Sequence, residues 1–345
     1  LNLSIGGTGT TDANTINGNG DVGIGVDVSG NGKAVVDVTN TTVTGTVDGS
    51  DPRWNGDGLG LRRSDSSLLL ATVTNSTFTG NAGDGMDVEA QGNDRFDPNQ
   101  PMSGTANSVT VKNSTFNNNT QNGARYRLHG DVTLISDVMG SSFNNNGQNG
   151  AVINVTEAAS FGDPTDGLPP GRRSIWDGNT YDQNGIDGIQ ISATGTSLPD
   201  DPRVLLEITS NRVPAASPAH AGANTNGDTS ISNNGRDGVR IETNDGRSDI
   251  LITSGTGNTV INGNGTTAGG NGIRWNESGS SEGIVRVSSV TISNSIRGAT
   301  EDLNGDGVVN EDLNGNGVLD PLEDVNGNGV LDTAEGLNNN GDIDV

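Results

Sequence analysis

The stretch Phe-Thr-Gly-Asn-Ala-Gly-Asp-Gly-Met-Asp-Val, residues 78–88, decides the fold, because variants of it recur along the chain. In the regular copies, an apolar or aromatic residue is followed by Asn three positions later and by Gly four positions after that, whereas the copy at Ile261 has a four-residue insertion between Asn264 and Gly272. An apolar-x-apolar segment begins after the Gly. The copies, about eight in all, start at Ile16, Phe78, Phe116, Phe143, Tyr181, Ile231 and Ile261, with a degenerate copy at Val43. Self-similarity at this spacing indicates a solenoid, in which each repeat stacks on the next.

The pattern within each copy has a period of two residues. Short alternating runs such as residues 109–111, 250–252 and 285–287 are bounded by Gly, Asn and Asp, so they are predicted to be β-strands. The extra residues that lengthen some copies always follow such a strand, which predicts loops on one face of the solenoid.

Stacked repeats place equivalent side chains on top of one another. We therefore expect one internal stack formed by Phe78, Phe116, Phe143 and Tyr181. We also expect a ladder of side chains hydrogen-bonded to the backbone of the next coil, formed by Asn81, Asn119, Asn146, Asn184 and Asn234.

These residues resemble the right-handed parallel β-helix family, which includes pectate lyases, polygalacturonases, tailspikes and many bacterial surface proteins. The resemblance covers about residues 12–297 and rests on the Asn ladder and the Gly-apolar-x-apolar strands. It implies an all-β protein, with a right-handed parallel β-helix of about eight coils in residues 1–300. The motifs of residues 301–345, described below, separately predict a short tandem calcium-loop segment that follows it. Fold resemblance says little about function.

The composition narrows the possible functions. The chain has 345 residues, 54 of them Gly, with no Cys, 3% aromatic residues and a formal net charge of −25. Such an acidic surface repels nucleic acids and anionic membranes, and no apolar run is long enough to span a bilayer. We expect a core of small apolar residues rather than large aromatic ones. Because the chain begins with Leu1 and shows no signal sequence, it looks like a mature product or an excised segment.

The strongest chemical signal is the acidic C-terminal segment. Residues 312–323 place oxygen ligands at the spacing of an EF-hand calcium loop, with Gly317 at the sharp turn. Residues 324–335 repeat this spacing at once. The predicted ligands of these two loops are Asp312, Asn314, Asn316, Val318, Asp320, Glu323, Asp324, Asn326, Asn328, Val330, Asp332 and Glu335.

Incomplete copies flank the two loops. Their candidate ligands are Asp302, Asn304, Asp306, Asn338, Asn340 and Asp344. Because the loops abut without helices between them, the segment resembles the tandem calcium repeats of type 3 thrombospondin modules and of bacterial surface proteins. It is also similar to dockerin loops, which however have a spacer. The resemblance implies Ca²⁺ as the bound ion. A solvated acidic tail without metal is the alternative.

Catalysis would need a constellation that the repeats do not clearly supply, and the sequence favours a protein that is not an enzyme. The weak candidates are Asp187 and Asp237, which precede the ladder Gly in consecutive coils and would lie about one strand spacing apart. Retaining glycosidases use two carboxylates about 5 Å apart. Turn chemistry also explains the Asx residue at this position.

A lyase-type site would need a basic residue beside an acidic cluster. Arg125 or Arg127 could be that base, but the sequence shows no matching acidic trio on adjacent coils. The three tryptophans could stack on sugars, although Trp275 falls on an inward position and is expected in the core.

Together these features predict an extracellular or cell-surface structural or adhesive solenoid with a calcium-stabilised connector. Its expected partners are further copies of itself, joined end to end in a filament, or a cell-surface polysaccharide. Two alternatives remain: a polysaccharide lyase or glycoside hydrolase acting on an acidic glycan, and a carbohydrate-binding attachment module.

Overall fold

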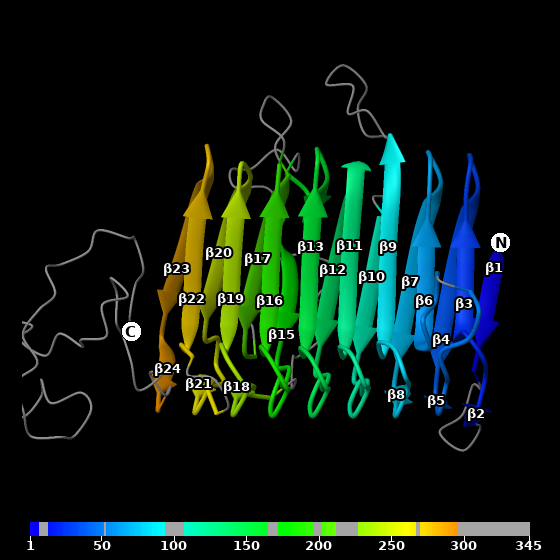
Figure 1. Cartoon of the computed structure of the whole chain (residues 1–345), viewed down its shortest axis with the longest axis horizontal. Helices are drawn as coiled ribbons and strands as arrows, with labels where there is room; N and C mark the ends of the chain where they lie inside the picture. Colours follow the sequence, from blue (N-terminus) through cyan, green and yellow to red (C-terminus); the bar gives the residue numbers. More distant parts are fainter. Residues whose placement is uncertain are drawn as a thin grey trace, which may run out of the picture.

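A computed structural model describes residues 1–6, 13–51, 53–93, 107–164, 172–195, 202–211, 227–266 and 270–294. Within these ranges every regular element is a β-strand, and all paired strands run parallel. The chain visits its sheets in turn, so that strands distant in sequence stand side by side along a rod (Figure 1). This arrangement agrees with the predicted all-β class and is compatible with a β-helix.

Two long sheets form the broad faces of the rod. The eight-stranded sheet contains β22 (Ile273–Ser278), β19 (Val239–Asn244), β16 (Ile189–Thr194), β13 (Ala151–Thr156), β11 (Ala124–Asp131), β9 (Met86–Asn93), β6 (Asp57–Arg63) and β3 (Val22–Val28). The ten-stranded sheet contains β1 (Asn2–Ile5), β4 (Lys33–Thr39), β7 (Leu68–Thr74), β10 (Asn107–Lys112), β12 (Thr133–Met139), β14 (Ser160–Phe161), β15 (Ser174–Asp177), β17 (Arg203–Thr209), β20 (Arg247–Thr253) and β23 (Glu282–Ser288).

Short strands form the narrow side. One three-stranded sheet contains β2 (Asn14–Asn17), β5 (Thr41–Thr44) and β8 (Thr77–Thr79), and the other contains β18 (Thr229–Ser232), β21 (Thr259–Asn262) and β24 (Val290–Ser293). Isolated parallel bridges join Thr77 to Thr115, Thr115 to Ser142, Ser142 to Thr180, and Thr180 to Ser230. The narrow side is therefore continuous from β2 to β24. We call the strands that lie at one level of the rod a layer.

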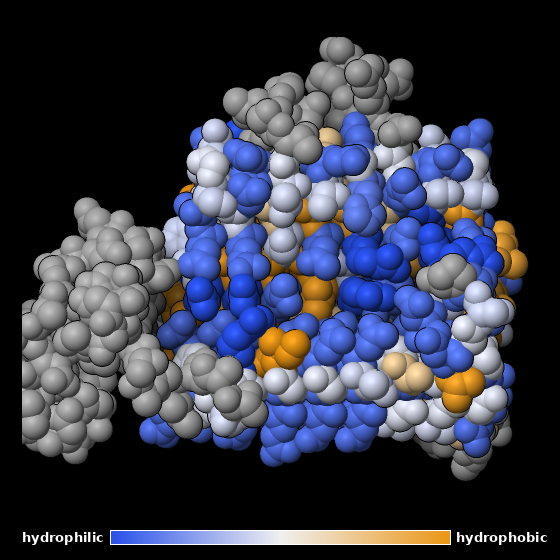
Figure 2. Space-filling model, viewed as in Figure 1, coloured by the Kyte–Doolittle hydropathy of each residue, from blue (hydrophilic) through white to orange (hydrophobic). Residues whose placement is uncertain are grey.

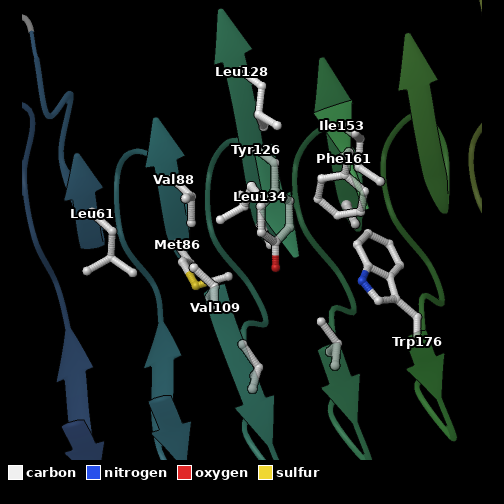
Figure 3. Packing of buried hydrophobic residues seen from close by; sticks show 14 of the residues in the cluster. Leu61, Met86, Val88, Val109, Tyr126, Leu128, Leu134, Ile153, Phe161 and Trp176 are labelled. Atoms are coloured by element: carbon white, nitrogen blue, oxygen red, sulfur yellow. The ribbon is translucent and has the colours of Figure 1, made fainter. Parts of the chain in front are cut away.

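The core fills the space between the faces with columns of equivalent side chains. On the eight-stranded sheet, Leu61, Val88, Tyr126 and Ile153 occupy neighbouring strands in register and are fully buried. Their side chains point toward the opposite sheet, where Val109 and Leu134 meet them (Figure 3). The polar residues between them in sequence point outward, as the period of two requires.

The predicted aromatic stack is present. The Phe78 and Phe116 rings lie 5.1 Å apart, the Phe116 and Phe143 rings 5.0 Å, and the Phe143 and Tyr181 rings 5.1 Å, all nearly parallel. Trp176 stacks on Tyr181 and meets Phe161 edge-on. With Tyr126 also in contact, the few aromatic residues concentrate in the central layers. The other core residues are mostly Val, Ile, Leu and Ala, in line with the expectation of a core of small apolar residues.

The predicted Asn ladder is also present. The backbone N–H of Asn119 donates to Oδ1 of Asn146 at 3.0 Å, and that of Asn146 donates to Oδ1 of Asn184, also at 3.0 Å. The ladder reaches further than predicted, because Thr46 donates to Asn81 at its start and Asn234 donates to Asn264 at its end. Each of these Asn side chains is buried, so the ladder satisfies backbone groups that water cannot reach.

Candidate functional site

The predicted metal ligands, from Asp302 to Asp344, lie outside the residues that the structure describes. Among the described residues, no group of three or more His, Cys, Asp or Glu side chains is placed to hold a metal ion. The calcium site therefore stays a prediction for the segment 301–345.

The structure does bring Asp187 and Asp237 into adjacent layers. The backbone N–H of Asp237 donates to Oδ1 of Asp187 at 3.0 Å, and Arg236 holds the same carboxylate through Nε at 2.9 Å and Nη2 at 2.6 Å. Both Asp side chains have an exposed fraction of 0%. Burial, reinforced by the charge of Asp187, raises the pKa of Asp237. A sugar could reach neither carboxylate without movement of the surrounding chain.

These two residues belong to a second ladder that the sequence did not reveal. From Asp57 to Asp237, the Asx side chain before each ladder Gly accepts a hydrogen bond from the backbone N–H of its equivalent in the next layer. We call this the Asx ladder; its members are Asp57, Asp84, Asn122, Asn149, Asp187, Asp237 and Asn271. Asp and Asn both offer an Oδ1 acceptor, so these hydrogen bonds explain why either residue occurs at this position. The pattern does not need a catalytic role to explain it.

A cluster of charges covers the outward face of β6, β9 and β11. Arg125 contacts Asp84 at 2.9 Å and Asp87 at 3.1 Å. Arg127 contacts Asp87 at 2.5 Å and Glu89 at 2.9 Å, while Arg62 reaches Glu89 from the other side at 2.9 Å. We call these six residues the β9–β11 charge cluster. Figure 2 shows strongly hydrophilic side chains gathered over β9 and β11 on this face.

The two kinds of charge in this cluster differ in accessibility. The side chains of Asp84 and Asp87 are fully buried, whereas those of Arg125 and Arg127 keep 19% and 27% of their surface exposed. Burial raises the pKa of Asp84, against the opposing effect of the Arg125 guanidinium. The surface that a ligand meets is therefore guanidinium, with compensating carboxylates beneath it.

Asp84, Asp87 and Glu89 lie beside Arg125 and Arg127 in the preceding layer, where the two arginines engage them. They do not form a group placed to hold a metal ion, so the expectation that no acidic trio matches these arginines for a lyase-type site is not contradicted. Register explains the contacts: Arg125 pairs with Asp87 and Arg127 pairs with Glu89 across β11 and β9. The sequence already contained the signal for these pairs. Arg125 and Asp87 each stand two residues after their ladder Gly, and Arg127 and Glu89 each stand four residues after it.

Two tryptophans are unavailable for stacking on sugars. Trp176 is 1% exposed within the core, and Trp54 is 7% exposed, with its ring over Gly60 and the Arg62 guanidinium 5.7 Å from its centroid. Trp275 is partly buried and packs against the core, in line with its predicted inward position.

The comparisons with known proteins place the chain in no family. No family model, no curated protein and no solved structure matches it. Among the described residues, no helix is long and apolar enough to cross a membrane.

Proposed function

We propose that the protein is an extracellular structural or adhesive solenoid, built as a right-handed parallel β-helix of about eight coils. The observation that carries this proposal is the continuity of its two ladders. The Asn ladder links layers from Thr46 to Asn264, and the Asx ladder links them from Asp57 to Asn271. A rod whose adjacent layers are joined by continuous hydrogen-bond ladders resists local opening. Such resistance suits a protein that bears mechanical load or holds an adhesive surface away from the cell.

Location on the cell surface is tested by labelling intact cells with an antibody raised against the rod. We expect labelling without permeabilisation, because a surface protein is accessible. Labelling only after permeabilisation would contradict the extracellular assignment.

In this proposal residues 301–345 form a connector that calcium orders. Twelve carboxylates without a compensating Lys or Arg repel each other when the metal is absent. Isothermal titration of the full chain should show saturable Ca²⁺ binding, weakened by Asp312→Ala and by Asp324→Ala. Equal binding of Mg²⁺, or no effect of either substitution, would argue against EF-hand-type loops in this segment.

The connector also supports the assembly part of the proposal, in which copies join end to end and calcium orders the junction. Electron microscopy before and after EDTA tests this part. Polymers that are unchanged after calcium removal would show that calcium does not hold the junction.

The β9–β11 charge cluster favours a second candidate function, the binding or cleavage of an acidic glycan. Its partly exposed guanidinium groups could bind glycan carboxylates, as bidentate donors commonly do. Binding to immobilised polyuronates, with Arg127→Gln as the weakened variant and Arg53→Gln as the control, tests this candidate. Equal binding by all three proteins would remove it.

A further inference from the structure

We infer that the two ends of the rod form one complementary interface, in which β23 and β24 of one copy pair with β1 and β2 of the next. This inference rests on the proposed assembly function and specifies its junction. Among the residues that the structure describes, β1 pairs with β4 alone and β2 with β5 alone, whereas β23 pairs with β20 alone and β24 with β21 alone. Each end thus offers unpaired backbone N–H and C=O groups to another strand.

The most exposed large apolar side chains lie in the first two layers and on the last strand of the ten-stranded sheet. The large hydrophobic residues with the greatest exposure among the described ranges are Leu1 at 70%, Val47 at 54%, Ile284 at 48%, Val287 at 44% and Val35 at 36%. The first, second and last of these belong to the N-terminal layers, and the other two lie on β23. In Figure 2 hydrophobic side chains are visible at the N-terminal edge of the rod. Val35 and Ile284 occupy outward positions of the ten-stranded sheet, whereas Val287 belongs to an inward column that is open at the end of the rod. The apolar area that an end-to-end contact can bury is therefore that of the inward columns.

The core columns of the ten-stranded sheet and of the narrow side match across the two ends, whereas the eight-stranded sheet, within the described ranges, has one level fewer and would lack one strand at the junction. Strand register places Leu3 and Val285 at opposite ends of one inward column, and Ile5 and Val287 at opposite ends of the neighbouring one. Ile16 and Ile292 likewise begin and end the column that contains the aromatic stack. A second copy added at the ordinary strand spacing would therefore continue three apolar columns without a change of register.

The outward charges also match. Arg286 lies on β23 with half of its side chain exposed. Register through the ten-stranded sheet puts it in one column with Ser4 on β1 and with the exposed Asp37 on β4. In the stacked arrangement Asp37 of the next copy lies two strands from Arg286. Arg173 spans a similar separation to reach Asp249 at 2.6 Å, so this ion pair is within reach.

Such a contact is heterologous, since unlike surfaces meet, and it generates open filaments. The partner is a second copy of this chain rather than an unrelated protein, because both halves of the interface are present on one molecule.

The test is sedimentation velocity of the full chain at increasing concentration, in Ca²⁺. We expect growing oligomers for the wild type. We expect no growth for Val287→Glu and for Ile5→Glu, each of which blocks one end. A mixture of the two variants should form dimers and nothing larger, because one intact junction remains. Thr194→Glu, on the broad face at mid-rod, should assemble like the wild type.

The outward charges provide a second test, in which the folding of each variant is checked by circular dichroism because Arg286 also contacts Asp249 of its own chain at 3.2 Å. Arg286→Asp and Asp37→Arg should each weaken assembly at least tenfold in concentration, and the double variant should restore it. Wild-type oligomers that both variants leave unchanged would show that copies assemble through another surface. That outcome overturns this interface and leaves the assembly proposal standing.

A wild type that stays monomeric at all concentrations would overturn both proposals. Hydrogen exchange of the monomer then identifies the occupant of the open end. Protected amides along β23 would show that the chain's own residues 295–345 cover it.

Discussion

Asn122 donates its backbone N–H to the carboxylate of Asp84 at 2.8 Å, and its side-chain amide donates to the same oxygen. This bond points from a later layer to an earlier one. The neighbouring Asn ladder runs the other way, since Asn81 donates forward to Asn119. The turn between the two ladders is therefore held from both directions, and adjacent layers cannot slide without breaking one set of bonds.

The Gly that follows each Asx is required by close approach of the layers. A Cβ on Gly123 would lie 2.6 Å from the carbonyl oxygen of Gly150 and 2.9 Å from Nδ2 of Asn146. Gly123→Ala should therefore lower the free energy of unfolding by about 1–3 kcal/mol, measured by urea denaturation. Gly20→Ala is the matched control, because nothing lies within 4 Å of its Cβ position. Equal losses for the two variants would contradict this account.

The sequence predicted the elements that repeat at a fixed offset, because stacking forces equivalent residues together. Phe78 over Phe116 and Asn119 under Asn146 were both predictable on this ground. The sequence did not predict features that depend on which layers are neighbours and what covers them. The register of β11 against β9 follows from the repeat, but the diagonal contact of Arg127 with Asp87 needed the positions of the side chains. The place of Trp176 in the core needed the split of one layer into β14 and β15, which no repeat pattern shows.

Asn146 tests the contribution of the Asn ladder. Its Oδ1 accepts from the backbone N–H of Asn119 at 3.0 Å and from the Asn119 side chain at 3.2 Å. Asn146→Ala leaves the buried backbone N–H of Asn119 without an acceptor, whereas the Asn119 side chain keeps the Phe78 carbonyl oxygen at 3.1 Å, so the free energy of unfolding should fall by about 1–3 kcal/mol. Gln148→Ala, on the exposed side of the same turn, should unfold like the wild type. An Asn146→Ala protein with wild-type stability would mean that the ladder does not stabilise the rod.

Arg127 tests whether the β9–β11 charge cluster stabilises the sheet. Arg127→Leu removes one of two guanidinium partners of the buried Asp87. Leaving a buried charge without its partner costs about 3–5 kcal/mol, and the remaining Arg125 should keep the loss below that range. Arg53→Leu removes an exposed arginine from an exposed pair with Asp51 and should change little. Thermal unfolding of both variants measures the difference, and equal melting temperatures would contradict the prediction.

Asp57 makes stability depend on pH. Burial raises its pKa from 3.8 to about 8, and the neighbouring Asp84 and Asp87 charges reinforce the shift against the opposing effect of Arg125. The unfolded chain releases this proton near pH 4 and the folded chain retains it until about pH 8. The associated stability is therefore complete below pH 4 and is lost as pH rises toward 8.

Asp57→Asn removes this proton while keeping the Oδ1 that accepts the Asp84 backbone N–H at 2.7 Å. Asn122 and Asn149 already occupy equivalent positions, so the substitution suits the ladder. The variant should gain stability relative to the wild type as pH rises from 4 to 8, and the gain should level off above pH 8. Denaturation curves at several pH values measure this difference. A difference that stays constant across the range would show that Asp57 does not hold its proton in the folded protein.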